Sequence, residues 1–180
     1  GRLVPMKGQE FLIKAFAELA HNFPHVRLVL VGDGELYVAL QSLARQLRID
    51  QVITFAGFRD DLQAMYSSFD IYAHPSVEGG GETFPFAVLQ ALAEELPVVV
   101  TRVGDVPAMV EEGVNGFVVP DRSPLQLADR LHDLLRQPEL RKKMARRSRE
   151  RLLKHFTISA MVDAIERIYN SLLTSKKQPQ

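Results

Sequence analysis

The fold of this chain is decided by one stretch, His74-Pro-Ser-Val-Glu-Gly-Gly-Gly-Glu82-Thr-Phe-Pro-Phe-Ala-Val-Leu-Gln90-Ala-Leu-Ala93. It starts at the end of an apolar run, passes through a proline and three consecutive glycines, and then becomes helical in pattern. It stops before a second apolar run, Pro97-Val-Val-Val100. This order predicts a strand, a flexible loop, a helix and another strand. Loops at the carboxyl ends of parallel strands are where open α/β sheets bind ligands.

Two polar side chains belong to the predicted helix. We expect Glu82 at the point where the loop becomes helical, and Gln90 follows about two turns later on the same face. A helix N-terminus attracts anions, and glycines let the backbone approach a ligand. Both side chains could therefore face one ligand. The alternative is that Glu82 is an acid favoured by the helix dipole and Gln90 is a solvated polar residue.

Composition bounds the class of protein. The chain has 180 residues, 46% of them hydrophobic, which predicts one domain or one large fragment. The formal net charge is zero, from 22 basic and 22 acidic residues, so no bulk field attracts nucleic acid or a membrane. Cysteine is absent, which excludes disulfides and fits a reducing compartment, so we expect a cytoplasmic location. No apolar stretch approaches the ~18 residues of a membrane span.

Strand-like and helix-like segments alternate over the first two thirds of the chain. This pattern predicts an α/β fold with a Rossmann-like, doubly wound parallel sheet and helices on both faces. After residue 124 the pattern is helical throughout, which predicts a helical C-terminal extension. We expect one domain over residues 1–173 and a disordered tail over 174–180. The expected strands are 26–31, 52–55, 70–74, 97–100 and 117–119. Asp60 or Asp61 can cap a short helix that ends at Ser67. The other expected helices are 9–22, 36–47, 82–93, 108–112, 125–135, 139–155 and 157–173.

Several motifs occur in a fixed order. Together they resemble the C-terminal, donor-binding domain of the family 4 (group 1) retaining glycosyltransferases, one half of the GT-B architecture. The resemblance extends from Gly1 to about Tyr169. No motif is specific alone, but the ordered set is: Gly1-Arg2-Leu3 with Lys7-Gly8, Leu30-Val-Gly-Asp-Gly34, Phe55-Ala-Gly57, Pro75-Ser76, Glu82-x7-Gln90-Ala-Leu-Ala93, Pro97-Val-Val-Val-Thr101 and Asn115-Gly116.

The resemblance implies a nucleotide-sugar as ligand and an absent N-terminal domain that holds most of the acceptor site. It also implies a first central strand ending at Gly1-Arg2. Residues 1–8 look like a loop that leaves a strand, so we expect this domain to lack its first strand. On this basis the isolated domain binds nucleotide but does not transfer sugar.

Three residues are implied as catalytic. Sugar transfer leaves growing negative charge on the diphosphate, which a metal or fixed cations must stabilise. The sequence has no Asp-x-Asp motif, and GT-B enzymes generally use an Arg and a Lys. We therefore expect no metal and no cofactor, with Arg2 and Lys7 on the diphosphate and Glu82 near the anomeric centre. The alternative is that both cations are solvated loop residues.

The remaining expected contacts are to the nucleotide-sugar. Gln90 stands where the family usually has a second Glu that accepts both ribose hydroxyls, so weaker ribose binding is expected. Pro85, expected in the first helical turn, and Ala108 also depart from the family pattern. The expected nucleotide-sugar-binding residues are Gly32, Gly34, Phe58, Arg59, Gly81, Thr83, Phe84 and Gln90.

Alternatives stay open at several points. Because Gln90, Pro85 and Ala108 depart together, the chain could be a nucleotide-binding module with impaired catalysis. A GT-B nucleotide-sugar epimerase is a further possibility, although its additional acids and histidines are not seen. His74, at a strand end, is either a general base or a histidine hydrogen-bonded in the loop. The basic helix 139–151 is a solvated face or, with lower preference, a membrane contact.

Overall fold

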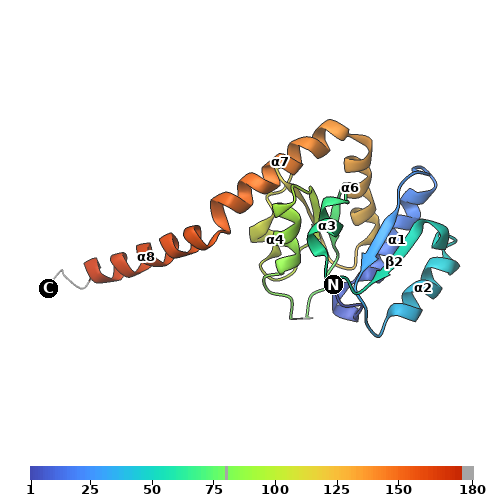
Figure 1. Cartoon of the computed structure of the whole chain (residues 1–180), viewed down its shortest axis with the longest axis horizontal. Coiled ribbons are helices and arrows are strands. Elements are labelled where there is room, and N and C mark those ends of the chain that lie inside the picture. Colours follow the sequence, from blue (N-terminus) through green and yellow to red (C-terminus); the bar gives the residue numbers. More distant parts are fainter. Residues whose placement is uncertain (80, 176–180) are drawn as a thin grey trace.

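The computed structural model describes residues 1–79 and 81–175 and has an α/β architecture (Figure 1). The strands are β1 (Leu28–Val31), β2 (Ile53–Gly57), β3 (Tyr72–His74), β4 (Val98–Thr101) and β5 (Gly116–Val119). The α-helices are α1 (Gln9–Ala20), α2 (Tyr37–Gln46), α3 (Leu62–Ser67), α4 (Phe86–Ala93), α5 (Val106–Met109), α6 (Pro124–Arg136), α7 (Pro138–His155) and α8 (Ile158–Ser175). Short 3-10 turns, η1 (Pro5–Lys7) and η2 (Asp50–Val52), precede α1 and β2.

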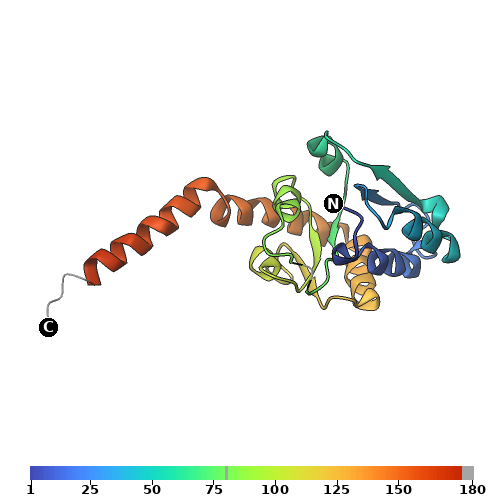
Figure 2. The ribbon, with the colours of Figure 1, turned by 90° about the horizontal axis from the view of Figure 1, so that it is seen from below.

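The strands form two parallel sheets. One has the order β1-β2 and the other β3-β4-β5, with every pairing parallel. Figure 2 shows β1 and β2 as a pair of arrows beside the other three strands. The expected α/β class with parallel strands is therefore confirmed, although the strands are divided between two sheets.

Helices cover both faces, as the alternation along β4 shows. Side chains of successive strand residues point to opposite faces. Val99 belongs to a core shared with α1 and α6, whereas Val98 and Val100 belong to a second core with α4 and α5. All three valines are fully buried, as expected for a continuous apolar strand between two helical layers.

A gap separates the two sheets. The edges of β1 and β3 that face each other carry no strand partner in the described structure. A cavity of about 410 Å³ lies there, lined by residues of both edges, among them Leu28, Val29, Tyr72 and Ala73. At one end of β1, the amino group of Gly1 donates a hydrogen bond to the Val31 carbonyl oxygen (2.6 Å). The gap lies where the expected first strand belongs; that strand itself stays a prediction.

The expected start of helix α4 was wrong. Helix α4 begins at Phe86, with Pro85 as its N-cap in an extended conformation, so Pro85 precedes the first turn. Glu82 is consequently a loop residue, and the helical spacing to Gln90 does not apply. Proline explains the late start, since the residue before it is disfavoured in the α region.

The other differences lie at α3 and α8. Asp61 precedes α3 but makes no side-chain cap, because its carboxylate is held by Arg59. Helix α8 extends through Ser175, two residues into the expected tail; residues 176–180 lie outside the described structure.

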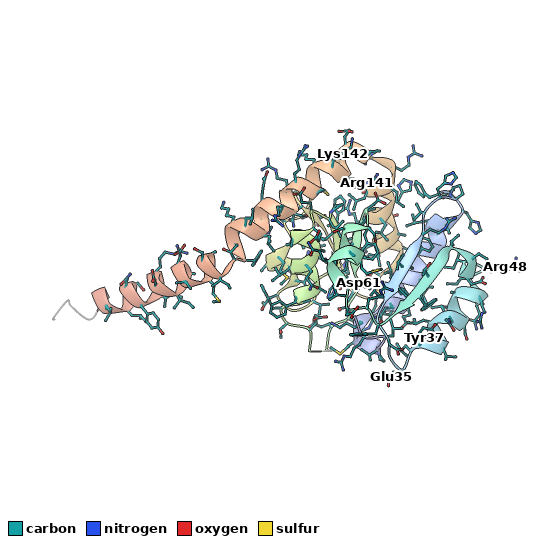
Figure 3. The ribbon with its side chains drawn as sticks, in the orientation of Figure 1. Glu35, Tyr37, Arg48, Asp61, Arg141 and Lys142 are labelled. Atoms are coloured by element: carbon teal, nitrogen blue, oxygen red, sulfur yellow. The ribbon has the colours of Figure 1, made fainter. Side chains whose placement is uncertain are left out.

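The C-terminal helices differ in how they contact the domain. Helix α7 packs on α4, and its Ser148 hydroxyl donates to the carbonyl oxygens of Leu96 (2.7 Å) and Asn115 (3.2 Å). Arg141 and Lys142 mark the corner between α6 and α7 in Figure 3. Helix α8 leaves this body and extends outward (Figures 1 and 3), with large apolar side chains such as Ile158 and Tyr169 exposed. Within residues 1–79 and 81–175, no helix is long and apolar enough to cross a membrane.

Candidate functional site

Four loops meet at the carboxyl edges of the strands: residues 1–8, 32–34, 75–83 and 101–105. Backbone hydrogen bonds join them in pairs. The amide of Leu3 donates to the Asp33 carbonyl (2.9 Å), and the amide of Val77 donates to the Met6 carbonyl (2.9 Å). The amide of Asp105 donates to the Thr83 carbonyl (2.9 Å). The loop with the candidate cations therefore lies between the β1–α2 loop and the loop with Glu82.

Glycines permit these close approaches. Gly8 has φ 64°, and a Cβ at this position would lie 2.0 Å from the Pro75 carbonyl oxygen. A Cβ at Gly32 would lie 1.9 Å from the carbonyl oxygen of Gly1, and one at Gly34 would lie 2.5 Å from that of Leu3. No side chain fits in such contacts, so Gly32 and Gly34 hold residues 1–3 against the end of β1.

The Glu82 carboxylate is the centre of a polar cluster. Its Oε2 accepts hydrogen bonds from Ser76 Oγ (2.8 Å), from His74 Nε2 (3.2 Å) and from the ammonium group of Lys7. The side chain of Glu82 is only 9% exposed, and that of Lys7 is 21% exposed. Two expected catalytic residues, Lys7 and Glu82, are therefore brought into direct contact.

The cluster keeps Glu82 ionised. The hydrogen bond from His74, together with those from Lys7 and Ser76, lowers the pKa of Glu82 from 4.5 to about 2, against an opposing effect of burial. The described bonds of this carboxylate all end on Oε2. Its second oxygen, Oε1, is thus left to accept from a ligand hydroxyl.

The second ring nitrogen of His74, Nδ1, also has a hydrogen-bond partner. Nδ1 lies 3.3 Å from the Tyr72 hydroxyl, and the two rings stack with centroids 6.2 Å apart. Burial raises the pKa of Tyr72 well above its usual range, so this hydroxyl stays protonated. The Thr101 hydroxyl binds the main chain of the same segment, at the carbonyl oxygens of Ser76 (2.5 Å) and His74 (3.2 Å).

The other expected contact residues in this region make no described hydrogen bond to the Glu82 carboxylate. Arg2 is exposed, and its carbonyl oxygen accepts a hydrogen bond from Gln9 Nε2 (2.8 Å). Gly81 and Thr83 are exposed loop residues on either side of Glu82. Phe84 is partly exposed and packs against Phe156 of the α7–α8 junction, with ring centroids 5.8 Å apart. Gln90 is exposed on α4.

Phe58 and Arg59 follow β2, away from the polar cluster. The Phe58 side chain is 80% exposed. Arg59 binds the carboxylate of Asp61 in a bidentate manner, at 2.7 and 2.6 Å, and Asp61 can be located in Figure 3 at the start of α3. A base that stacks on Arg59 would therefore meet a guanidinium that is already paired.

Sequence reasoning missed part of the cluster. Ser76 and Tyr72 were not expected to contact Glu82. His74 was expected as a general base or as a histidine hydrogen-bonded in the loop, and the structure shows it hydrogen-bonded, with Glu82 as the partner that was not foreseen. Two signals were available: the His74-Pro-Ser76 motif directly follows a strand, and alternation along that strand places Tyr72 and His74 on one face. Among residues 1–79 and 81–175, no group of three His, Cys, Asp or Glu side chains is arranged to hold a metal ion.

The sequence and the structure match known glycosyltransferases. The family model described as "Glycosyl transferases group 1" matches residues 1–151. A D-inositol 3-phosphate glycosyltransferase of Corynebacterium jeikeium is 34% identical over 182 residues, which cover 96% of this chain and 42% of the relative.

Two solved structures support the same assignment. HepE of Anabaena in complex with UDP superimposes with a TM-score of 0.85 at 28% identity, covering 95% of this chain and 47% of that protein. The C-terminal domain of a group 1 family glycosyl transferase from Francisella tularensis gives a TM-score of 0.81 at 26% identity, covering 88% of this chain and 84% of that domain. This chain spans less than half the length of the curated relatives that it matches.

Proposed function

Because this chain belongs to the group 1 glycosyltransferase family, we propose that it is the donor-binding half of an enzyme that moves a hexose from a nucleotide-sugar to an acceptor with retention. The acceptor site belongs to a second domain, which corresponds to the part of the relatives that this chain does not match. The isolated domain then binds the donor without transferring its sugar.

The contact between Lys7 and Glu82 carries the proposal. It places a cation and an ionised carboxylate side by side at the edge of the sheets where α/β proteins bind ligands. A departing diphosphate needs positive charge, whereas an oxocarbenium-like sugar is stabilised by negative charge. Lys7 supplies the first, with Arg2 of the same loop as its partner, and Glu82 supplies the second.

A uridine nucleotide is the donor that we propose to test first. HepE, a structural neighbour at 28–29% identity, was solved with UDP and with UDP-glucose. The loops 1–8 and 32–34 of this chain are packed together by glycines, and they leave backbone rather than bulky side chains beside the expected diphosphate. Lys7 and Arg2 replace a divalent metal in this proposal.

The test is binding of UDP and UDP-glucose to the 180-residue chain, measured by calorimetry in EDTA and in Mg2+. We expect dissociation constants between micromolar and millimolar, equal in both buffers (~−4 to −8 kcal/mol). Lys7→Ala and Arg2→Ala should each weaken binding by about tenfold or more, because each removes a charge-assisted bond. Lys14→Ala is the matched control, since Lys14 pairs with Glu10 on an exposed helix face.

Two results would contradict the proposal. Binding that requires Mg2+ would mean that a metal, not Lys7 and Arg2, neutralises the diphosphate. Equal loss in the Lys7 and Lys14 variants would mean that general surface charge, not this loop, attracts the nucleotide.

A module with impaired catalysis is the second candidate, supported by the amide at Gln90. If Gln90 faces the ribose, Gln90→Glu should tighten UDP binding by about 1 kcal/mol, because a neutral hydrogen bond becomes charged. A 2′,3′-dideoxy nucleotide should then bind the natural chain more weakly than UDP. If both changes are without effect, Gln90 does not contact the ribose, and the full-length enzyme's activity must be tested before catalysis is assigned.

A further inference from the structure

Glu82 is positioned by its partners and not by secondary structure. It lies four residues before the first residue of α4, in a loop that follows Gly79 and ends at Pro85. Its main chain is supported on one side, where a Cβ at Gly104 would lie 2.2 Å from the Glu82 carbonyl oxygen. The direction of the carboxylate is set by the three side chains that bind Oε2.

The protons in this cluster can be assigned from geometry. A carboxylate only accepts, so Ser76 Oγ and His74 Nε2 must both donate to Glu82 Oε2. His74 Nε2 also lies 3.1 Å from Ser76 Oγ. With its proton on Nε2, a neutral imidazole offers Nδ1 as an acceptor to the Tyr72 hydroxyl 3.3 Å away, which is also hydrogen-bonded to Tyr66. A proton donated by Tyr72 to Nδ1 favours the tautomer of His74 that can bind Glu82.

These groups come from parts of the chain that are fixed independently of the Glu82 loop. Tyr72 and His74 lie on one face of β3, which pairs with the fully buried β4. Ser76 is fully buried, and Thr101 at the end of β4 holds its carbonyl oxygen. The cluster thus anchors to the sheet a carboxylate that belongs to neither a helix nor a strand.

From this arrangement we infer that His74 and Ser76 are positioning residues for Glu82: they hold its Oε2 and direct its Oε1 toward a hydroxyl of the donor sugar, with Tyr72 fixing the tautomer of His74. The inference rests on the proposed function, because it assigns the sugar to the free oxygen of Glu82. It assigns different roles to these partners. Lys7 is partly exposed, and Glu82 is its one described side-chain partner, so it can turn to the diphosphate. His74 and Ser76 are buried and stay with Glu82.

The experiment compares UDP-glucose with UDP, because only the first has a sugar. Ser76→Ala and His74→Leu should weaken UDP-glucose binding by about fivefold or more and leave UDP binding within about twofold. His74→Gln retains an amide donor near the position of Nε2 and should restore part of the loss. Tyr72→Phe should have the same selectivity with a smaller effect, since it frees the tautomer without removing the donor.

A second measurement detects the contact without any ligand. Titration of the Glu82 side-chain carboxyl by 13C NMR should show its pKa rising in Ser76→Ala and in His74→Leu. Ser67→Ala is the matched control, because the Ser67 hydroxyl donates to Glu94 (2.8 Å) in an exposed hydrogen bond outside the site.

The outcomes distinguish the proposed donor-binding function from the positioning role of His74 and Ser76. If the natural chain binds neither UDP nor UDP-glucose, the proposed function fails and the positioning role fails with it. If it binds both but the variants lose UDP and UDP-glucose equally, His74 and Ser76 are structural residues and only the present inference is overturned. An unchanged Glu82 pKa in folded Ser76→Ala overturns it as well.

Discussion

At the scale of residues, Glu82 lies in the loop before α4, and its carboxylate is bound by the side chains of Lys7, His74 and Ser76. The spacing to Gln90 suggested two residues on one helix face, yet Glu82 precedes the helix. Its identity as a candidate also came from the ordered motifs, and its role at the site stays a prediction. Its contact with Lys7 could not be predicted, because Lys7 is 75 residues away and no pattern along the chain encodes which oxygen a distant ammonium will bind.

The lowered pKa of Glu82 predicts how stability depends on pH. A carboxyl whose pKa is 4.5 when unfolded and about 2 when folded stabilises the fold above pH 4.5. That contribution is lost as the pH falls through about 2 and corresponds to at most about 3 kcal/mol. We expect Glu82→Gln to be less stable than the natural chain at pH 6, with a smaller difference at pH 3, in urea unfolding.

A control is available on α1. Glu10 pairs with Lys14 on an exposed face, so Glu10→Gln should change stability little at either pH. The difference in free energy of unfolding between the natural chain and Glu82→Gln should shrink from pH 6 to pH 3. A difference that stays constant would show that the ionised carboxylate does not stabilise the fold.

At the scale of elements, Gly8 sets the position of the cation loop. Ala at this position would need a left-handed backbone and would place its Cβ against the Pro75 carbonyl. We expect Gly8→Ala to be destabilised by more than the ~1–2 kcal/mol that the left-handed conformation alone costs. Nucleotide binding should weaken in the same variant, because Lys7 is displaced. Thermal unfolding and calorimetry measure the two effects.

Gly113→Ala is the control that separates the cost of a left-handed backbone from the cost of a steric clash of the added Cβ. Gly113 also has a positive φ, of 74°, but a Cβ there meets nothing within 4 Å. This variant should lose only the conformational cost and should keep nucleotide binding. If Gly8→Ala and Gly113→Ala are destabilised equally, the close contact between Gly8 and the Pro75 carbonyl oxygen does not contribute to stability.

The elements themselves were largely predictable. Apolar periodicity located all five strands and the long helices, since burial sets both patterns. The parallel class followed from alternation of strands and helices. The start of α4 was predicted too early, because Pro85 delays the helix. At α3, Asp61, one of the two cap candidates, binds Arg59 instead of capping the helix. The division into two sheets could not be derived from periodicity, because each strand has the same pattern whether or not its edge is paired.

At the scale of the molecule, the gap between β1 and β3 predicts that a further strand stabilises the domain. The Gly1 amino group already binds the Val31 carbonyl, so residues added before Gly1 can run parallel to β1 along its free edge. We expect a five-residue extension of Val and Ile to raise stability by about 2 kcal/mol, as apolar burial outweighs ordering. A Gly-Ser extension of equal length is the control. Equal thermal midpoints for the two would argue against the gap as a strand site.

Because of the same gap, the candidate site is built from loops of both sheets, β1-β2 and β3-β4-β5. Gly32 and Gly34 follow β1 in one sheet, His74 ends β3 in the other, and the loop of Lys7 contacts both. A ligand that spans these loops and a strand that fills the gap would each bias the same relative arrangement of the sheets. By thermodynamic reciprocity, whatever factor the added strand contributes to nucleotide affinity, the nucleotide returns to the pairing of that strand.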